Sequence, residues 1–234
     1  SHQASIVATN LGANLDATNR ALDALRRELP ALLARDGDRK AAIERLEAMA
    51  GSTTGVRTFL VIDAGGTVVL ASRAGLVGTN FASSRHLRTL RDEHDPERVT
   101  FTPPFTTPLG VYTVGVIKAV VDDRRRYGGA VVAILDPDYV GTLLGSVLYA
   151  PDVRATLVHA GGTAAFSAPD PSMLRGTNLL ARPDSLFSRY VARGAGVQIA
   201  EDRAISSGDV RLAAYRPVGS TTVHPDPTLV VMAS

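Results

Sequence analysis

Two histidines and a short acidic run are the side chains of this chain that could hold a metal ion. His86 and His94 flank Asp92 and Glu93 along the sequence. The two histidines do not occupy the i and i+4 positions with which a zinc motif presents its ligands on one helical face. We therefore predict no metal site, and we expect residues 92–97 to form a solvated helix end.

Sequence patterns of catalysis are absent from the chain. It contains no G-x-S-x-G, H-E-x-x-H, P-loop or G-x-G-x-x-G pattern, and it has no cysteine. These four motifs would indicate a nucleophile, a catalytic metal or a phosphate-binding turn. The lack of cysteine excludes disulfides, thiolate catalysis and cysteine metal ligands. We predict that the chain is not an enzyme and binds no cofactor.

The charge balance argues against a nucleic-acid partner. The chain has 25 Lys and Arg against 23 Asp and Glu, which leaves a formal charge of +2. The basic run 124–126 lies in a predicted hairpin turn and has no interleaved aromatic residues. Nucleic-acid-binding surfaces instead present a basic stripe or patch. We expect this run to be a solvated turn.

The composition is that of a folded globular protein, with 45% hydrophobic and 21% charged residues. No apolar run approaches the roughly 20 residues of a membrane-spanning helix. The start of the chain shows no basic region followed by an apolar core, so no signal peptide is predicted. Because the chain opens inside a predicted helix, we expect it to be the extramembrane part of a longer protein.

The first 50 residues are predicted to be helical, because apolar residues recur along one stripe. Pro30 has no N–H to give to the preceding turn, so a kink or a restart of the helix is expected there. Residues 36–38 end this segment, and a second helix is expected over 39–50. The stripe is explained either by burial against the rest of the chain or by dimerisation through residues 4–29. Its members are Leu11, Leu15, Thr18, Leu22, Leu25, Leu29 and Leu32.

After residue 55 the spacing of the apolar residues becomes that of β-strands. A Gly-rich turn over 64–66 joins the first two strands into a hairpin. Ser83 or Ser84 is expected to cap a helix that runs to about His94, and Pro137 to open another that runs to about Leu148. The strands are predicted over 56–63, 67–72, 111–121 and 128–136.

From residue 151 a shorter version of the same plan repeats. Its hairpin turns at 160–162, and a G-T-N loop at 176–178 follows as the one at 78–80 follows the first hairpin. A helix is predicted over 184–192, and strands over 154–159, 163–167, 197–201, 210–216 and 228–233. Hairpins mixed with helices indicate an α+β fold with antiparallel sheets. We expect an N-terminal helical stalk over 1–55, a first unit over 56–150 and a second over 151–234.

These segments resemble the double Cache sensor domains of bacterial receptors, which consist of two PAS-like units behind a long N-terminal helix. The resemblance covers about residues 4–234, and its motifs follow one another in the order of the family. The segments that carry it are 60–68 (L-V-I-D-A-G-G-T-V), 77–80 (V-G-T-N), 84–87 (S-R-H-L), 102–105 (T-P-P-F), 129–140 (G-A-V-V-A-I-L-D-P-D-Y-V) and 213–218 (A-A-Y-R-P-V).

The resemblance implies a periplasmic sensor module of a membrane-anchored receptor, of the diguanylate cyclase or histidine kinase type. In that family a small organic ligand binds in the first, membrane-distal unit, and the module dimerises through its N-terminal helix. The alternative is a structural or protein-interaction module that binds no small molecule.

Arg85 and His86 are the first candidate ligand-binding residues that the resemblance implies. A guanidinium at the start of a helix suits a carboxylate, because it can donate two parallel hydrogen bonds. The alternative is a surface ion pair with Asp92 or Glu93. His86 would donate a hydrogen bond to the ligand or serve a structural contact.

Four further residues of the first unit are candidates. Tyr112 lies where the family places an aromatic ring over the pocket, with plain core packing as the alternative. Asp136 would bind an amine or hydroxyl, or else cap the helix that opens at Pro137. Phe101 and Phe105 would form an apolar lid, or else anchor their Pro-rich loop.

The chain departs from the family pattern at several pocket positions. Leu87 and Arg88 stand where the family often has two aromatic residues, and Ser84 where it has an aspartate. Ile134 replaces a carboxylate that amino-acid-binding members carry. A small carboxylate or another organic anion therefore fits Arg85 better than an amino acid does.

Overall fold

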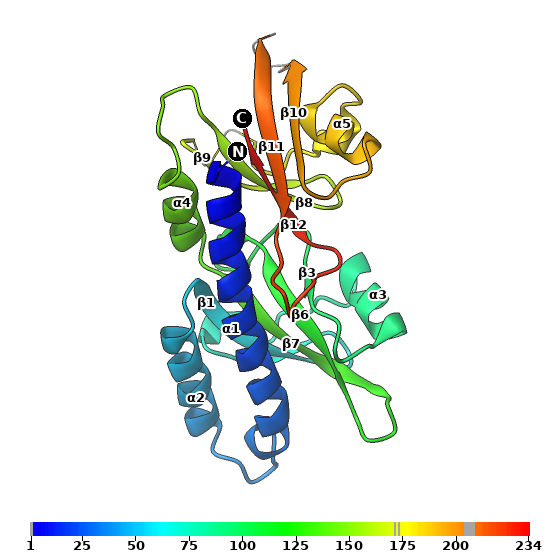
Figure 1. Ribbon diagram of the computed structural model, residues 1–234. Helices are drawn as coiled ribbons and strands as arrows, with labels where there is room; N and C mark the ends of the chain where they lie inside the picture. The colour runs from blue at the N-terminus through cyan, green and yellow to red at the C-terminus, as the bar shows by residue number, and fades with distance from the viewer. Residues whose placement is uncertain (1, 171, 173, 204–208) are drawn as a thin grey trace. The chain divides into compact units, whose positions relative to one another are not determined.

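The computed structural model describes residues 2–170, 172, 174–203 and 209–234 (Figure 1). The fold is α+β, with two five-stranded antiparallel sheets and a small two-stranded one. The chain divides into two compact units. We call Asn14–Asp136 the first unit, and Ser1–Ala13 together with Pro137–Ser234 the second unit.

The described elements follow the predicted order closely. The helices are α1 (His2–Leu32), α2 (Arg39–Ser52), α3 (Arg85–Glu93), α4 (Pro137–Gly145) and α5 (Leu186–Ala192), with short 3₁₀ turns η1 (Ala74–Leu76) and η2 (Leu179–Ala181). The strands of the first unit are β1 (Val56–Asp63), β2 (Val68–Ala71), β3 (Thr100–Phe101), β4 (Phe105–Thr106), β5 (Tyr112–Thr113), β6 (Gly115–Val121) and β7 (Tyr127–Leu135). Those of the second unit are β8 (Ala155–His159), β9 (Ala164–Ala168), β10 (Gln198–Arg203), β11 (Val210–Pro217) and β12 (Leu229–Ala233).

Helix α1 continues through Pro30, so the restart, one of the two expected effects of this proline, does not occur. Pro30 lies in the last turn, and the helix ends at Leu32. A proline this close to the end costs the helix one backbone hydrogen bond and interrupts little that follows. The chain then turns into α2, whose N-cap Asp38 accepts hydrogen bonds from the N–H groups of Lys40 and Ala41.

Apart from Leu32, which is partly exposed, the leucine stripe of α1 is buried within the chain's own fold. Leu22 and Leu25 have no exposed surface, and Leu11, Leu15 and Leu29 are buried as well. Burial against the rest of the chain, one of the two predicted roles of the stripe, is therefore confirmed.

No helix of the described residues is both long and apolar enough to cross a membrane.

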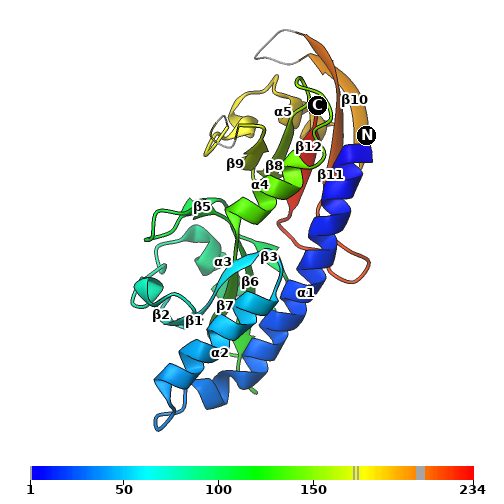
Figure 2. The ribbon, with the colours of Figure 1, turned by 90° about the vertical axis from the view of Figure 1, so that its left-hand side faces the viewer.

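The sheet of the first unit has the strand order β2-β1-β7-β6-β3. Leu60 pairs with Val132, and Val132 in turn pairs with Ile117, so these three side chains share one face. Helix α3 packs against this face through Leu87 and Leu90. Helices α1 and α2 lie on the other side of the sheet (Figure 2).

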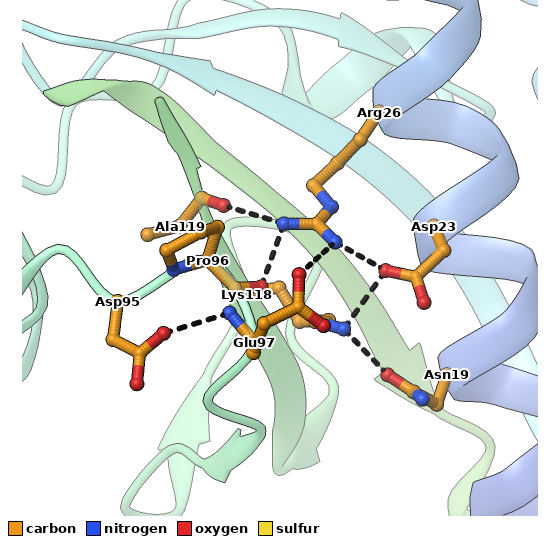
Figure 3. A network of polar contacts seen from close by, with 8 residues as sticks. All are labelled: Asn19, Asp23, Arg26, Asp95, Pro96, Glu97, Lys118 and Ala119. Carbon is orange, nitrogen blue, oxygen red and sulfur yellow. Dashed lines mark hydrogen bonds and ion pairs between the residues drawn. The ribbon is translucent and has the colours of Figure 1, made fainter. Parts of the chain in front are cut away.

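A buried lysine ties the first sheet to α1. Lys118 of β6 is 1% exposed, and its ammonium donates hydrogen bonds to Asn19 Oδ1 at 2.9 Å and to Asp23 Oδ1 at 2.8 Å (Figure 3). Arg26 donates to the same oxygen of Asp23 at 2.5 Å and to the Pro96 carbonyl oxygen at 2.6 Å. Each charge therefore has a partner of opposite sign or a carbonyl oxygen, as buried charges require.

The long strand predicted over 111–121 is broken at Val114. Residues on either side of this position pair with different partners, β5 with β4 and β6 with β7 and β3. The hydroxyl of Thr113 donates to the Leu135 carbonyl oxygen at 2.8 Å and holds the break in place. The Pro-rich passage over 102–108, expected to be a loop, contributes the short strand β4, and the short strand β3 directly precedes it.

The predicted duplication is confirmed down to individual hydrogen bonds. The second sheet has the order β10-β11-β12-β8-β9, which matches the first when β8 and β9 are set against β1 and β2. Thr67 bridges to Asn80 in the first unit as Thr163 bridges to Asn178 in the second. Both G-T-N loops thus close back on their hairpin in the same way.

The compact units are divided at Asp136. Helix α4 belongs to the second unit, where it contacts β8 and β9, although the sequence grouped it with the strands before it. Residues of α1 from Asn14 onward and all of α2 belong to the first unit. The predicted stalk over 1–55 is thus shared between the two units.

Candidate ligand-binding site

A cavity of about 420 Å³ opens in the first unit between the sheet, α3 and the Pro-rich loop. We call it the cup. The floor of the cup consists of apolar side chains from one sheet face, which alternation along the strands directs to the same side. These are Leu60 and Ile62 of β1, Ile117 of β6, and Val132 and Ile134 of β7.

The N-terminal end of α3 and the Pro-rich loop form the walls. Ser84 caps α3 by accepting a hydrogen bond from the Leu87 N–H at 3.4 Å, which places Arg85 and His86 at the rim. Across the cup, Phe105 meets Phe81 edge to face, with ring centroids 6.3 Å apart. Thr102, Pro103, Pro104, Thr106, Thr107 and Pro108 complete the loop wall, and Leu76 lines the cup from η1.

Arg85 lies at the rim with an exposed side chain. The predicted alternative, an ion pair with Asp92 or Glu93, is wrong. Glu93 pairs with Arg98, and Asp92 lies 3.5 Å from Arg91. Among the described residues no hydrogen bond or ion pair engages the Arg85 guanidinium, so its donors are available to a ligand.

His86 combines a place on the cup wall with a structural contact. Its Nε2 lies 3.2 Å from the hydroxyl of Thr100 on β3. His94, by contrast, ends α3 in a left-handed conformation with φ of 32°. No group of three or more metal-ligating side chains occurs within the described part of the chain.

Three of the predicted residues lie outside the lining of the cup. Phe101 is buried and pairs with Val116, whose side chain points away from the face that carries Ile117. Tyr112 belongs to the small β4-β5 sheet. Asp136 follows β7, and its N–H donates to the Gly55 carbonyl oxygen at 2.8 Å. The structure therefore brings together Arg85, His86 and Phe105 of the six.

Sequence reasoning named Ile134 as a pocket position but missed the rest of the floor of the cup and Phe81. The floor residues are ordinary strand residues, and only their alternation marks them as one face. Phe81 directly follows the first G-T-N loop, and that position was the available signal. Leu87, noted only as a departure from the family pattern, also lines the cup.

The cup is apolar with one positive charge at its rim. Among the described residues that line it, Arg85 alone carries a formal charge at neutral pH and none is acidic. An apolar body would lie over the sheet, and an anionic group would reach the guanidinium. Because Ile134 on the floor is apolar, it offers the ammonium group of a ligand no negative charge.

In the second unit, aromatic side chains lie on the sheet face that corresponds to the floor of the cup. Tyr215 occupies the strand position that matches Ile117, and it stacks on Tyr190 of α5 with ring centroids 4.5 Å apart. Phe187 packs beside Tyr190 at 5.5 Å. All three rings are almost fully buried with Val158, Val230 and Met232. The two units therefore share a plan, but among the described residues large buried rings stand in the second unit where aliphatic side chains form the floor of the cup in the first.

No family model matches the chain, and no curated protein does. Solved structures do match over nearly its whole length. The extracellular domain of rpHK1S-Z16, described as a histidine kinase, superposes with a TM-score of 0.78 at 19% identity, covering 98% of this chain and 90% of that one.

Two chemoreceptor domains are also similar. The periplasmic sensory domain of Tlp1 from Campylobacter jejuni gives a TM-score of 0.69 at 14% identity, covering 99% of this chain and 90% of that one. The ligand-binding domain of PctC from Pseudomonas aeruginosa, in complex with GABA, gives 0.64 at 18% identity, covering 99% and 95%. The chain thus has the fold of extracytoplasmic sensory domains, as the resemblance predicted.

Proposed function

We propose that this chain is the extracytoplasmic sensor domain of a membrane-anchored receptor, and that it binds a small organic acid in the cup of its first unit. Binding would bias a separate output domain, and the chain itself would carry out no chemistry. A ligand can shift such an equilibrium only by its difference in affinity for the two states.

The observation that carries this proposal is the contrast between the two cups. Among the described residues, stacked Tyr190 and Tyr215 occupy the matching sheet face of the second unit, whereas the first unit has a cavity of about 420 Å³ there. Protein interiors are normally close-packed, and a largely apolar pocket of 300–1,000 Å³ with a few polar groups is typical of a ligand site. A purely structural module would have no need of the open cup.

The charges of the cup favour an organic monocarboxylate with an aliphatic or aromatic body. Arg85 can donate two hydrogen bonds to a carboxylate, while the floor residues take up the apolar part. The PctC domain binds GABA, which carries an amine as well. An amine would lie here in an apolar site without a carboxylate partner, which is unfavourable.

We also propose that dimerisation through α1, if the receptor uses it, relies on a face other than the leucine stripe. The stripe is buried, whereas Ile6 is 37% exposed and Ala13 lies on the same exposed side. Sedimentation of the wild-type protein and of Ile6→Glu tests this. A dimer that Ile6→Glu leaves intact would contradict it.

The binding proposal is tested by titration calorimetry with butanoate, hexanoate, benzoate and phenylacetate. The matched amines and L-amino acids serve as comparison ligands. We expect at least one carboxylate to bind, its amine counterpart not to bind, and Arg85→Gln to weaken the carboxylate about tenfold or more. Arg35→Gln, an equal charge change in the α1–α2 loop, is the control and should leave binding unchanged. Failure of every carboxylate would overturn the proposed ligand class.

A further inference from the structure

Two threonine hydroxyls in the loop wall of the cup are held by the protein's own backbone. Thr102 Oγ1 accepts a hydrogen bond from the Gly115 N–H at 2.8 Å, and Thr107 Oγ1 accepts one from the Val111 N–H at 3.2 Å. Both threonines line the cup. Their hydroxyls serve to hold the loop, so their presence in the wall does not require a polar ligand.

Two further polar side chains of the wall are also engaged. Ser84 caps α3, and His86 lies within hydrogen-bond distance of Thr100. Among the described lining residues, the polar side chains that make no hydrogen bond are those of Arg85 and Thr106, and both are exposed. Polar recognition of a ligand is therefore concentrated on one anionic group beside Arg85, and the rest of the cup offers apolar contacts.

The cup is too large for a short acid. A closed apolar cavity of about 150 Å³ holds one molecule of benzene. The cup has a volume of about 420 Å³, nearly three times as much. A short acid such as butanoate would leave much of the apolar floor in contact with water, which is unfavourable. The volume corresponds instead to a hydrocarbon body of about 10–14 carbon atoms.

The walls of the cup extend its apolar lining beyond the floor. Leu76 of η1 and Leu87 of α3 are buried and line the cup, and Phe81 and Phe105 pack against the same apolar cluster as the floor. A hydrocarbon chain in the cup is therefore surrounded by carbon atoms on several sides. Each methylene group that enters should strengthen binding about threefold to fourfold.

We propose that the ligand of the cup is a carboxylic acid with an unbroken hydrocarbon body of about 10–14 carbon atoms. The proposal rests on the function proposed above and narrows its ligand class to acids without a further polar group. The carboxylate lies at the Arg85 guanidinium, and the chain covers Leu60, Ile117 and Val132. A second polar group on the chain would lie over this floor without a partner, which is unfavourable.

The test is calorimetric titration of the whole chain with the straight-chain acids from hexanoate to hexadecanoate, each below the concentration at which it forms micelles. We expect one site per chain. The dissociation constant should fall about threefold with each added methylene up to about dodecanoate. Beyond about tetradecanoate it should level off, because further carbon atoms would remain in water.

Three ligands of equal length and two variants serve as controls. Dodecan-1-ol, dodecylamine and dodecanedioate should each bind at least about tenfold more weakly than dodecanoate, since they lack the carboxylate or carry a second one. Val132→Phe, which places a ring into the cup, should abolish binding. Val197→Phe enlarges a side chain of the second unit that is 66% exposed and should leave binding unchanged.

Two results would overturn the inference while leaving the proposed function distinguishable from it. Equal affinities for hexanoate and dodecanoate would mean that the cup binds carboxylates but does not select a long hydrocarbon body. Equal binding of dodecanoate by Val132→Phe and the wild type, or binding at several sites per chain, would show adsorption outside the cup. Binding of no acid of any length would overturn both the inference and the function proposed above.

Discussion

Ile117 and Lys118 are neighbours on β6, and their side chains leave the first sheet on opposite faces. Ile117 lines the cup, while Lys118 reaches α1 and lies 2.8 Å from the Asp23 carboxylate. The cup and the polar network that joins the sheet to α1 (Figure 3) therefore lie on opposite faces of one strand. A displacement of β6 at the cup would therefore also move Lys118 relative to Asp23.

Replacing Lys118 by methionine should destabilise the first unit by about 2 kcal/mol, because the substitution leaves Asp23 without its buried partner. Asp23 keeps its contact with Arg26 and is 26% exposed, which limits the loss. Urea unfolding measures the effect. The double variant Asp23→Leu/Lys118→Met should recover part of the stability, and a double variant less stable than Lys118→Met would contradict this account of the pair.

The same network predicts a loss of stability in acid. Burial opposes ionisation of Asp23, but hydrogen bonds and charge from Lys118 and Arg26 outweigh it, so the pKa of Asp23 lies below its ordinary value of 3.8. Its contribution is therefore complete above that value and disappears as the pH falls through the folded-state pKa. In urea unfolding between pH 6 and 2, Asp23→Asn should show a flatter acid decline than the wild type. Parallel declines would show that Asp23 does not contribute.

Gly129→Ala should destabilise the protein by about 3 kcal/mol or more. Gly129 has φ of +129°, and an added Cβ would lie 2.1 Å from the Ile62 carbonyl oxygen. The neighbouring Gly128 has no such constraint, since its Cβ would meet ordinary contacts from 3.6 Å outward. Gly128→Ala is therefore the control, and equal melting temperatures for the two variants would refute the steric argument.

Truncating Tyr190 to alanine should cost about 3–5 kcal/mol, because it removes a buried ring from the stack that fills the second cup. Tyr149→Ala, whose parent side chain is 74% exposed, should change stability by less than about 0.5 kcal/mol. Chemical unfolding of both variants checks the difference. A small effect at Tyr190 would mean that the second cup is not held closed by this stack.

The order of the elements could be predicted from the sequence because each begins and ends at a local signal. Ser84 caps α3 as its position before the helix predicts, and the G-T-N loops mark both hairpins. The resemblance to the double Cache family, and not these local signals, pointed to Arg85 and His86, which both line the cup. The strands β3 and β4 could not be predicted, because each has only two residues and so shows no alternation.

The open state of the cup could not be predicted either. Whether a cup is filled depends on rings that meet across the fold, as Tyr190 and Tyr215 do, and no local pattern reports such a contact. The direction in which their strands point their side chains explains why Phe101 and Tyr112 do not line the cup. The break at Val114 divides the strand, so counting along 111–121 does not tell which side chains face the cup.

Filling the cup should abolish ligand binding without unfolding the protein. Val132 lies on the floor, and Val132→Phe would place a ring into the open volume. We expect the variant to remain folded by circular dichroism and to lose carboxylate binding altogether. Unchanged affinity would place the ligand elsewhere.

A crystal structure of the protein with the tightest-binding carboxylate tests the central claim most directly. The account predicts density for the ligand in the first cup, with its carboxylate on the Arg85 guanidinium and its apolar body over Leu60 and Val132, and an intact Tyr190–Tyr215 stack in the second. A first cup closed by its own side chains, or a ligand bound outside it, would contradict the account.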